Sequence, residues 1–220
     1  PKGTKGISIF IVPKYLVNPD GSLGKFNDVT CAGIEHKMGI KGSATCTLSF
    51  GDNGNCIGFL LGEERKGMKI MFQMMNEARL GVGMQGLALA SSAYMHAVTY
   101  TKNRKQGVHV TQMLNPEAQS VTISQHPDVK RMLLYMKSYV EGMRILSYYL
   151  AHNLNLAHVA KGDEAKEALA LAEVLIPICK AGNTDTAVLV TSEAVQCYGG
   201  YGYCSDYPVE QLMRDSKITA

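Results

Sequence analysis

The spacing of apolar residues changes once along this chain of 220 residues, and the change limits the folds that the chain can adopt. Before residue 62, Ile7, Ile9 and Ile11 alternate with Ser8 and Phe10, which is the two-residue period of half-buried strands. After Gly62 the apolar residues recur every three or four positions, as on a helix that faces a core. The sequence therefore predicts an α+β fold, mainly helical, with a β unit followed by a helical bundle.

Four helices are expected after the β unit. The first covers residues 63 to about 100, and the second opens at Pro127 and continues for about seven turns. A third begins near Gly162. Gly182-Asn-Thr-Asp185 supplies a terminating glycine and an N-cap for a fourth helix, which ends at Gln196. Short connections between these helices favour a bundle.

The first of these helices carries an unusual group of small residues, including Gly81, Gly83 and Gly86. A glycine inside a helix costs about 1 kcal/mol relative to alanine. A cluster that tolerates this cost predicts close approach of another helix or of a ligand to this face.

Composition excludes several classes of function. The net charge of +3 is small and the basic residues are dispersed, which argues against a nucleic-acid binder. No apolar run approaches the roughly 20 residues that span a bilayer, and the six histidines show no metal-binding spacing. The cysteines form no Cys-x-x-Cys pair and lie in apolar runs, so buried free thiols of an intracellular protein are expected at Cys31, Cys46, Cys56, Cys179, Cys197 and Cys204.

A glycine-rich turn closes the helical region. The predicted fourth helix is followed by the paired glycines Gly199 and Gly200, and a short helix restarts at Pro208 with Asp206 as its expected N-cap. Without side chains, these glycines let another group approach the backbone. Both a planar polar ligand and an ordinary subunit contact fit the turn and its tyrosines. A Rossmann loop does not, because the glycines follow a helix and not a strand.

Several separated stretches together resemble the FAD-dependent acyl-CoA dehydrogenases. They occur in the family's order: Gly6-Ile-Ser-Ile-Phe-Ile-Val-Pro13, Glu35-His-Lys-Met-Gly-Ile-Lys-Gly-Ser43, Met74-Met-Asn-Glu-Ala-Arg-Leu80, Gln125-His-Pro-Asp-Val129, Gln196-Cys-Tyr-Gly-Gly-Tyr-Gly-Tyr203 and Tyr207-Pro-Val-Glu-Gln-Leu-Met-Arg-Asp215. The segment Lys14 to Ser22 resembles a bacterial branch that includes 3-(methylthio)propanoyl-CoA dehydrogenases.

The resemblance implies the second half of a middle β domain, residues 1–64, followed by most of a C-terminal four-helix bundle, residues 65–220. Both ends then look cut, as in part of a longer protein. In the family a carboxylate removes the α-proton of an acyl-CoA while a hydride leaves the β-carbon for the flavin, giving a trans-2-enoyl-CoA.

Matching positions imply the site residues. Arg104 and Gln106 correspond to FAD contacts at and near the diphosphate, where a guanidinium binds well. Gln196, Gly199 and Gly200 correspond to contacts with the same cofactor from the adjacent subunit of a dimer. Without the resemblance, Arg104 would be interpreted as a basic residue at the negative end of a helix.

The acyl-CoA site is implied at Asn76 and Arg79; the alternative is an ordinary helix residue in a buried salt bridge. No catalytic base is expected within the chain, because the usual glutamate belongs to a segment just after Ala220. Some members place it directly before the arginine that matches Arg79, but Ala78 occupies that position here. Glu77 lies about 100° around the helix and is not a substitute.

The resemblance also implies an acyl-CoA substrate, an electron-transfer flavoprotein or similar acceptor, and a homodimer or homotetramer. A cytoplasmic bacterial location is expected, with a mitochondrial one as the alternative. Two other functions stay open: an acyl-CoA oxidase, which passes the electrons to oxygen, and a catalytically inactive oligomerisation module of the same fold.

Overall fold

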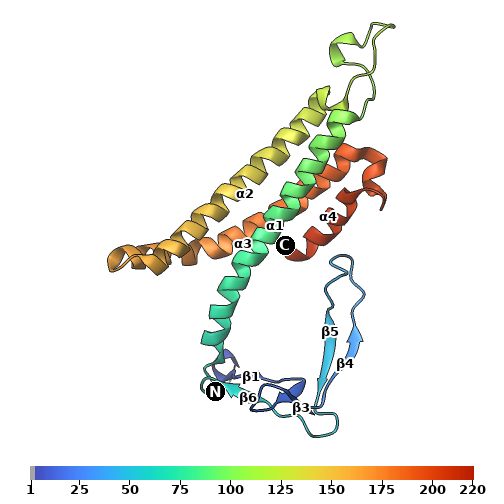
Figure 1. Ribbon diagram of the computed structural model, residues 1–220. Helices are drawn as coiled ribbons and strands as arrows, with labels where there is room; N and C mark the ends of the chain where they lie inside the picture. Colours follow the sequence, from blue (N-terminus) through green and yellow to red (C-terminus); the bar gives the residue numbers. More distant parts are fainter. Residues whose placement is uncertain (1–2) are drawn as a thin grey trace. The chain divides into compact units, whose positions relative to one another are not determined.

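The computed structural model describes residues 3–220. They form two compact units, one ending at Glu77 and one running from Ala78 to Ala220. All strands of the described residues lie in the first unit, and three of the four α-helices lie in the second. Helix α1 (Gly67–Asn103) belongs partly to each (Figure 1). The predicted order, a β unit followed by a mainly helical region, is confirmed.

The first unit contains three antiparallel pairs of strands. In the predicted strand region, β1 pairs with β6, β2 with β3, and β4 with β5. Their bounds are Ile9–Ile11 (β1), Tyr15–Val17 (β2), Leu23–Phe26 (β3), Val29–Ile34 (β4), Cys46–Phe50 (β5) and Phe59–Leu61 (β6). The predicted turn at Asn18 joins β2 to β3. The Asn18 backbone N–H donates to the Ser22 carbonyl at 2.9 Å.

Buried polar side chains hold the ends of these pairs together. The Asn27 amide nitrogen donates to the carbonyls of Pro13 and Ile57, each at 2.8 Å, and its oxygen accepts from the Ile57 N–H at 2.9 Å. Next to it, Asp28 accepts from the backbone and side chain of Asn53. These bonds satisfy polar groups in a unit that has few buried apolar residues.

The prediction of buried cysteines is wrong for four of the six. Cys179 and Cys197 are buried, whereas Cys56 is half-buried and Cys31, Cys46 and Cys204 are exposed. The strand cysteines are exposed because a two-stranded pair in this chain has no second layer over it, and Cys204 lies in a surface turn. All six are free thiols, as expected.

Three further helices build the second unit together with α1: α2 (Pro127–Val159), α3 (Asp163–Tyr198) and the short α4 (Pro208–Ser216). Helix α2 has 33 residues, about nine turns, and is therefore longer than predicted. Its inward positions recur at three and four residues, as expected, and pack against α1 and α3. The main core includes Leu87, Ala90, Met136, Val140, Val190, Ala194 and Val209.

The predicted break at Gly182-Asn-Thr-Asp185 does not exist, because α3 is continuous from Asp163 to Tyr198. Asn183 is buried, and its amide donates to the Gly83 carbonyl at 3.2 Å and to Ser147 Oγ at 2.9 Å. These contacts with α1 and α2 stabilise the helical backbone where local propensity favours a turn. Tertiary packing outweighs the cost of one helical glycine, about 1 kcal/mol.

The small residues of α1 have the predicted role at two positions. A Cβ on Gly86 would lie 3.0 Å from the Asn183 carbonyl oxygen, and one on Gly83 would lie 3.3 Å from that of Cys179. Here α1 approaches the backbone of α3. Gly81 is different, since a Cβ there would meet nothing within 4 Å.

The chain turns sharply after α3. Gly199 ends the helix with φ of 60°, and Gly199–Tyr203 forms a 3-10 turn (η4) before α4. The predicted capping role of Asp206 is wrong. Tyr207 occupies the N-cap of α4, one residue later, and no side chain caps this helix.

Candidate functional site

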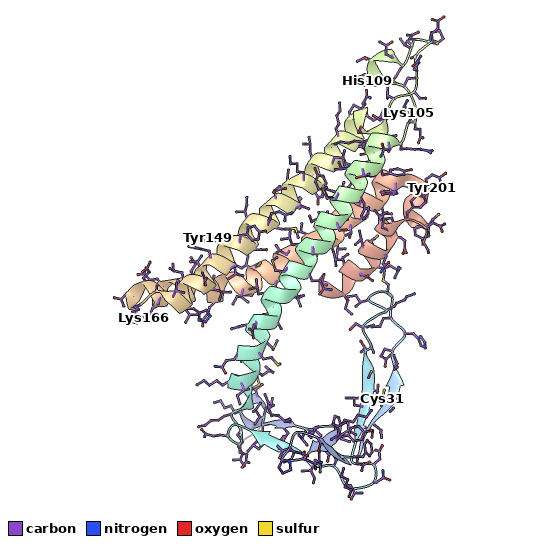
Figure 2. All side chains as sticks on the ribbon, in the orientation of Figure 1. Cys31, Lys105, His109, Tyr149, Lys166 and Tyr201 are labelled. Carbon is purple, nitrogen blue, oxygen red and sulfur yellow. The ribbon has the colours of Figure 1, made fainter. Side chains whose placement is uncertain are left out.

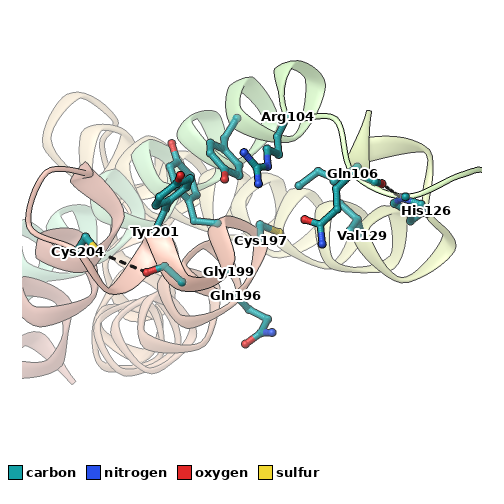
Figure 3. Close-up of a pocket in the computed structure, with 14 residues that line it drawn as sticks. Arg104, Gln106, His126, Val129, Gln196, Cys197, Gly199, Tyr201 and Cys204 are labelled. Carbon is teal, nitrogen blue, oxygen red and sulfur yellow. Dashed lines mark hydrogen bonds between the residues drawn. The ribbon is translucent and has the colours of Figure 1, made fainter. Parts of the chain in front are cut away.

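A pocket of about 810 Å³ lies in the second unit, where the end of α1, the start of α2 and the end of α3 meet (Figure 3). Three segments that are far apart in the sequence supply its walls. The five residues expected to contact the cofactor all line it: Arg104, Gln106, Gln196, Gly199 and Gly200. The structure thus brings this predicted set together at one pocket.

The backbone on both sides of Arg104 is anchored. The Arg104 N–H donates to the Tyr100 carbonyl at 2.8 Å, extending the hydrogen-bonding pattern of α1, and the Arg104 carbonyl accepts from the Ile123 N–H at 2.8 Å. Within residues 3–220 the guanidinium forms no ion pair with a carboxylate, and its Cζ lies over the Tyr201 ring, 5.6 Å from the centroid. Its charge therefore faces the pocket without a carboxylate to neutralise it.

The segment that carries Gln106 is held by the start of α2. The Gln106 backbone N–H donates to the Val121 carbonyl at 3.0 Å, and the Gln106 carbonyl oxygen lies 2.7 Å from His126 Nε2. The next residue, Gly107, has φ of 69° and lies under the His126 ring, where a Cβ would be 3.6 Å from a ring carbon. This fixes the backbone and leaves the exposed Gln106 side chain at the pocket.

The glycine turn forms the opposite wall. A Cβ built on Gly199 or Gly200 would meet nothing within 4 Å, so both backbones face open space. Gly202 differs, because a Cβ there would lie 2.3 Å from the Val195 carbonyl oxygen. The prediction of an approachable backbone therefore applies to the first two glycines, while the third serves the packing of the turn.

Four tyrosines line and support the pocket. Tyr100 and Tyr198 are stacked with centroids 4.0 Å apart, Tyr198 meets Tyr207 edge-on at 5.8 Å, and Tyr207 stacks on Tyr201 at 5.0 Å. Burial raises the pKa of the Tyr100 phenol, and the nearby Arg104 charge acts in the opposite direction. The stack leads from the buried Tyr198 to the half-exposed Tyr201.

The pocket also contains a deeply placed thiol. Burial, together with the negative charges of Glu193 and Asp128, raises the pKa of Cys197 to about 11. Its Sγ lies 3.8 Å from the Met132 sulfur. At neutral pH this thiol is protonated and serves as an apolar part of the wall.

Comparison with known proteins identifies the family. The family model for the C-terminal domain of acyl-CoA dehydrogenases matches residues 65–220. The chain belongs to the acyl-CoA dehydrogenase family. It is 44% identical to a butyryl-CoA dehydrogenase of Syntrophomonas wolfei, covering 98% of this chain and 36% of that protein.

Two further relatives support this placement. The chain is 40% identical to the 3-methylmercaptopropionyl-CoA dehydrogenase of Ruegeria pomeroyi, across 99% of this chain and 36% of that protein. The solved butyryl-CoA dehydrogenase of Megasphaera elsdenii superimposes with a TM-score of 0.73 at 33% identity, over 99% of this chain and 48% of that one. The chain thus spans between about a third and a half of the length of these acyl-CoA dehydrogenases.

The residues expected to line the acyl-CoA site lie elsewhere on the acyl-CoA dehydrogenase chain. Asn76 and Arg79 are half-buried residues of α1, three positions apart and therefore on the same side of the helix. Arg79 is about 37 Å from Arg104 along the helix axis, at about 1.5 Å a residue. Neither lines the pocket.

Sequence reasoning missed several residues of the pocket wall, among them Tyr100, His126 and Cys197. Helical spacing could have found Tyr100, since it lies four positions before Arg104 and thus on the same helix face. The contact of His126 with Gln106 spans 20 residues and is a result of the loop's path. Among residues 3–220, no cluster of three His, Cys, Asp or Glu side chains could hold a metal ion, and no helix could cross a membrane.

Proposed function

We propose that this chain is part of an FAD-dependent acyl-CoA dehydrogenase and that its pocket binds the diphosphate portion of FAD. The observation that carries the proposal is the convergence of Arg104, Gln106, Gln196, Gly199 and Gly200 on one pocket. They come from the end of α1, the following loop and the end of α3, so sequence proximity does not explain their meeting. Family membership supplies the identity of the cofactor.

The chemistry of the donor set fits a dinucleotide. Arg104 offers a guanidinium without a carboxylate partner within residues 3–220, and its planar N–H donors suit paired phosphate oxygens. Gln106 and Gln196 add exposed amide groups. Gly199 and Gly200 leave the backbone open, which lets a phosphate or ribose approach closely.

Each residue then has a distinct task. Arg104 neutralises the diphosphate, Gln106 donates to a neighbouring oxygen, and His126 keeps the Gln106 backbone in place. Gln196, Gly199 and Gly200 contact the same FAD, which also binds to the adjacent subunit, so that a dimer completes the site. FAD held by these residues would supply the acceptor for the hydride that leaves the β-carbon of the acyl-CoA.

The remaining parts of the reaction lie outside this pocket. We assign Asn76 and Arg79 to the acyl-CoA site, and the base that removes the α-proton to a segment beyond Ala220. Residues 1–64 then belong to a β domain and residues 65–220 to the helical bundle. The proposed partners are an acyl-CoA, an electron-transfer flavoprotein or similar acceptor, and further copies in a dimer or tetramer, in the cytoplasm of a bacterium.

The test uses the full-length protein expressed from its complete reading frame. We expect a yellow protein that carries FAD and reduces an artificial electron acceptor in the presence of an acyl-CoA. Arg104→Met should lower FAD affinity at least tenfold, because the substitution removes a charged bidentate contact. Lys102→Met is the matched control, since Lys102 is an exposed cation of the same helix end that does not line the pocket.

Four results would contradict the proposal or one of its parts. A colourless full-length protein without activity would refute it, and equal FAD affinity in both variants would refute the role of Arg104. Peroxide formation in place of acceptor reduction would identify an acyl-CoA oxidase. A full-length sequence that lacks the carboxylate beyond Ala220 would favour the inactive oligomerisation module.

A further inference from the structure

The guanidinium of Arg104 is held by an aromatic ring and not by a carboxylate. Its Cζ lies over Tyr201, 5.6 Å from the ring centroid, within the range of a cation–π contact. No carboxylate of residues 3–220 pairs with it. The difference matters chemically, because the N–H groups of arginine lie in the guanidinium plane, and a carboxylate partner would occupy them.

The ring that faces Arg104 is itself supported. Tyr201 is 46% exposed, yet it stacks on Tyr207 with centroids 5.0 Å apart and an interplanar angle of 27°. Tyr207 in turn meets the buried Tyr198, whose hydroxyl donates to the His96 carbonyl at 3.3 Å. The stack thus connects an exposed ring to the helical core and limits its rotation.

The backbone of the turn adds to this support. The Tyr201 carbonyl accepts from the Cys204 N–H at 3.1 Å, and Gly202 packs against the Val195 carbonyl, where no side chain would fit. Tyr201 lies at the same end of the second unit as Lys105 and His109 (Figure 2). The turn therefore presents one fixed aromatic face toward the end of α1.

We propose that Tyr201 is a positioning residue that holds the Arg104 guanidinium at the pocket and leaves its N–H donors free for a diphosphate. Tyr201 binds the charge through the face of its ring, whereas the diphosphate accepts hydrogen bonds in the guanidinium plane. The two contacts are compatible. Because Tyr201 already restricts the Arg104 side chain, less side-chain entropy is lost when the diphosphate binds. The inference rests on the proposed function for the identity of the anion.

The test measures FAD affinity of the full-length protein by the quenching of flavin fluorescence. Tyr201→Ala should raise the Kd for FAD about threefold to tenfold, as expected for loss of a cation–π contact that becomes desolvated on binding. Tyr201→Phe keeps the aromatic face and should stay within about twofold of the unchanged protein. Tyr203→Ala is the matched control, because Tyr203 belongs to the same turn, is 89% exposed and does not line the pocket.

A double-mutant cycle distinguishes positioning from a general effect on folding. In an Arg104→Met background, Tyr201→Ala should cause no further loss of FAD affinity, because its effect passes through Arg104. An equal loss in both backgrounds would overturn the inference. So would a failure of Tyr201→Phe to restore affinity.

A second measurement tests the contact without FAD. In nuclear magnetic resonance spectra, the Arg104 Nε–H signal should be shifted upfield by the ring current of Tyr201, and Tyr201→Ala should remove the shift. An Arg104 signal that does not respond to Tyr201→Ala would overturn the inference even if FAD binds. The shift could be present in a full-length protein that carries no FAD and whose FAD affinity does not fall in Arg104→Met. The proposed function would then be wrong, and so would the role of Tyr201 toward a diphosphate.

Discussion

Burial separates the six thiols of this chain into chemically different groups. Cys197 lies among Met132 and the tyrosines of the pocket wall, where its thiolate would be poorly solvated and would face Glu193 and Asp128. Cys204 is only seven positions away, but it is exposed in the turn before α4. The two residues share a sequence environment of tyrosines and glycines and differ in solvation.

We predict that iodoacetamide modifies Cys204 and spares Cys197 at pH 8. Burial raises the pKa of Cys197 from 9.0 to about 11, so the reactive thiolate is scarce and inaccessible. Mass spectrometry of modified peptides measures the difference. Because the raised pKa favours the protonated thiol, the stabilising contribution of Cys197 is present below pH 9 and is lost as the pH rises through about 11.

Cys197→Ala provides the control for the pH effect. This variant should lose less stability between pH 8 and pH 10 than the unchanged protein, because it has no thiol to ionise. Equal modification of Cys197 and Cys204 in the folded protein would contradict the prediction.

The helices of the second unit are held in register by close approach and by buried polar groups. Gly83 and Gly86 let α1 approach α3, and Asn183 joins α3 to both α1 and α2. From the same part of α3, Lys180 Nζ donates to the Thr219 carbonyl at 2.8 Å and Thr191 contacts Ser216 at 3.1 Å. These bonds fix the final turns of the chain on α3.

Two glycine substitutions on α1 should have opposite effects on stability. Gly86→Ala should destabilise the fold by about 1–3 kcal/mol, because its Cβ would lie 3.0 Å from the Asn183 carbonyl oxygen and 3.1 Å from the Thr184 Cα. Gly81→Ala should stabilise it by up to about 1 kcal/mol, since Cβ meets nothing there and alanine favours the helix. Urea unfolding curves measure both. Equal effects would show that helix propensity and not packing governs this face.

The two units of the chain differ in how much apolar surface they bury. The helical unit has a continuous core, whereas the strand pairs of the β unit leave large apolar side chains exposed, such as Val17 at 66% and Leu23 at 74%. Such exposure indicates surfaces that another segment covers. The relatives are two to three times longer than this chain, which agrees with the proposal that residues 1–64 belong to a larger β domain.

The 220-residue chain alone should therefore bind a hydrophobic fluorescent dye more strongly than the full-length protein does. Replacing the cross-strand pair Val17 and Leu23 with serine should reduce the fluorescence of the short chain and leave that of the full-length protein nearly unchanged. Equal dye binding by the short and full-length proteins would contradict the proposed larger domain.

Much of the fold and of the site could be predicted because local patterns carried the information. The period of apolar residues predicted the order of strands and helices, and the glycine turn after α3 was located correctly. Apart from the N-cap placed at Asp206 and not at Tyr207, the main errors concern contacts between separated segments. The predicted break at Gly182 was wrong because Asn183 donates hydrogen bonds to Gly83, 100 positions away, and to Ser147, 36 positions away. The exposed strand cysteines were misjudged because their burial depends on a second layer over the strands.

By itself, the sequence determined the order of elements, the turn at Gly199 and, through its motifs, the family. These features depend on backbone preferences and spacing along one segment. Only the tertiary structure decided that Arg104 faces Tyr201, that α3 is continuous, and that Gly199 and Gly200 face open space while Gly202 does not. Each of those outcomes depends on atoms from segments separated in sequence, and their free energies arise when the helices pack.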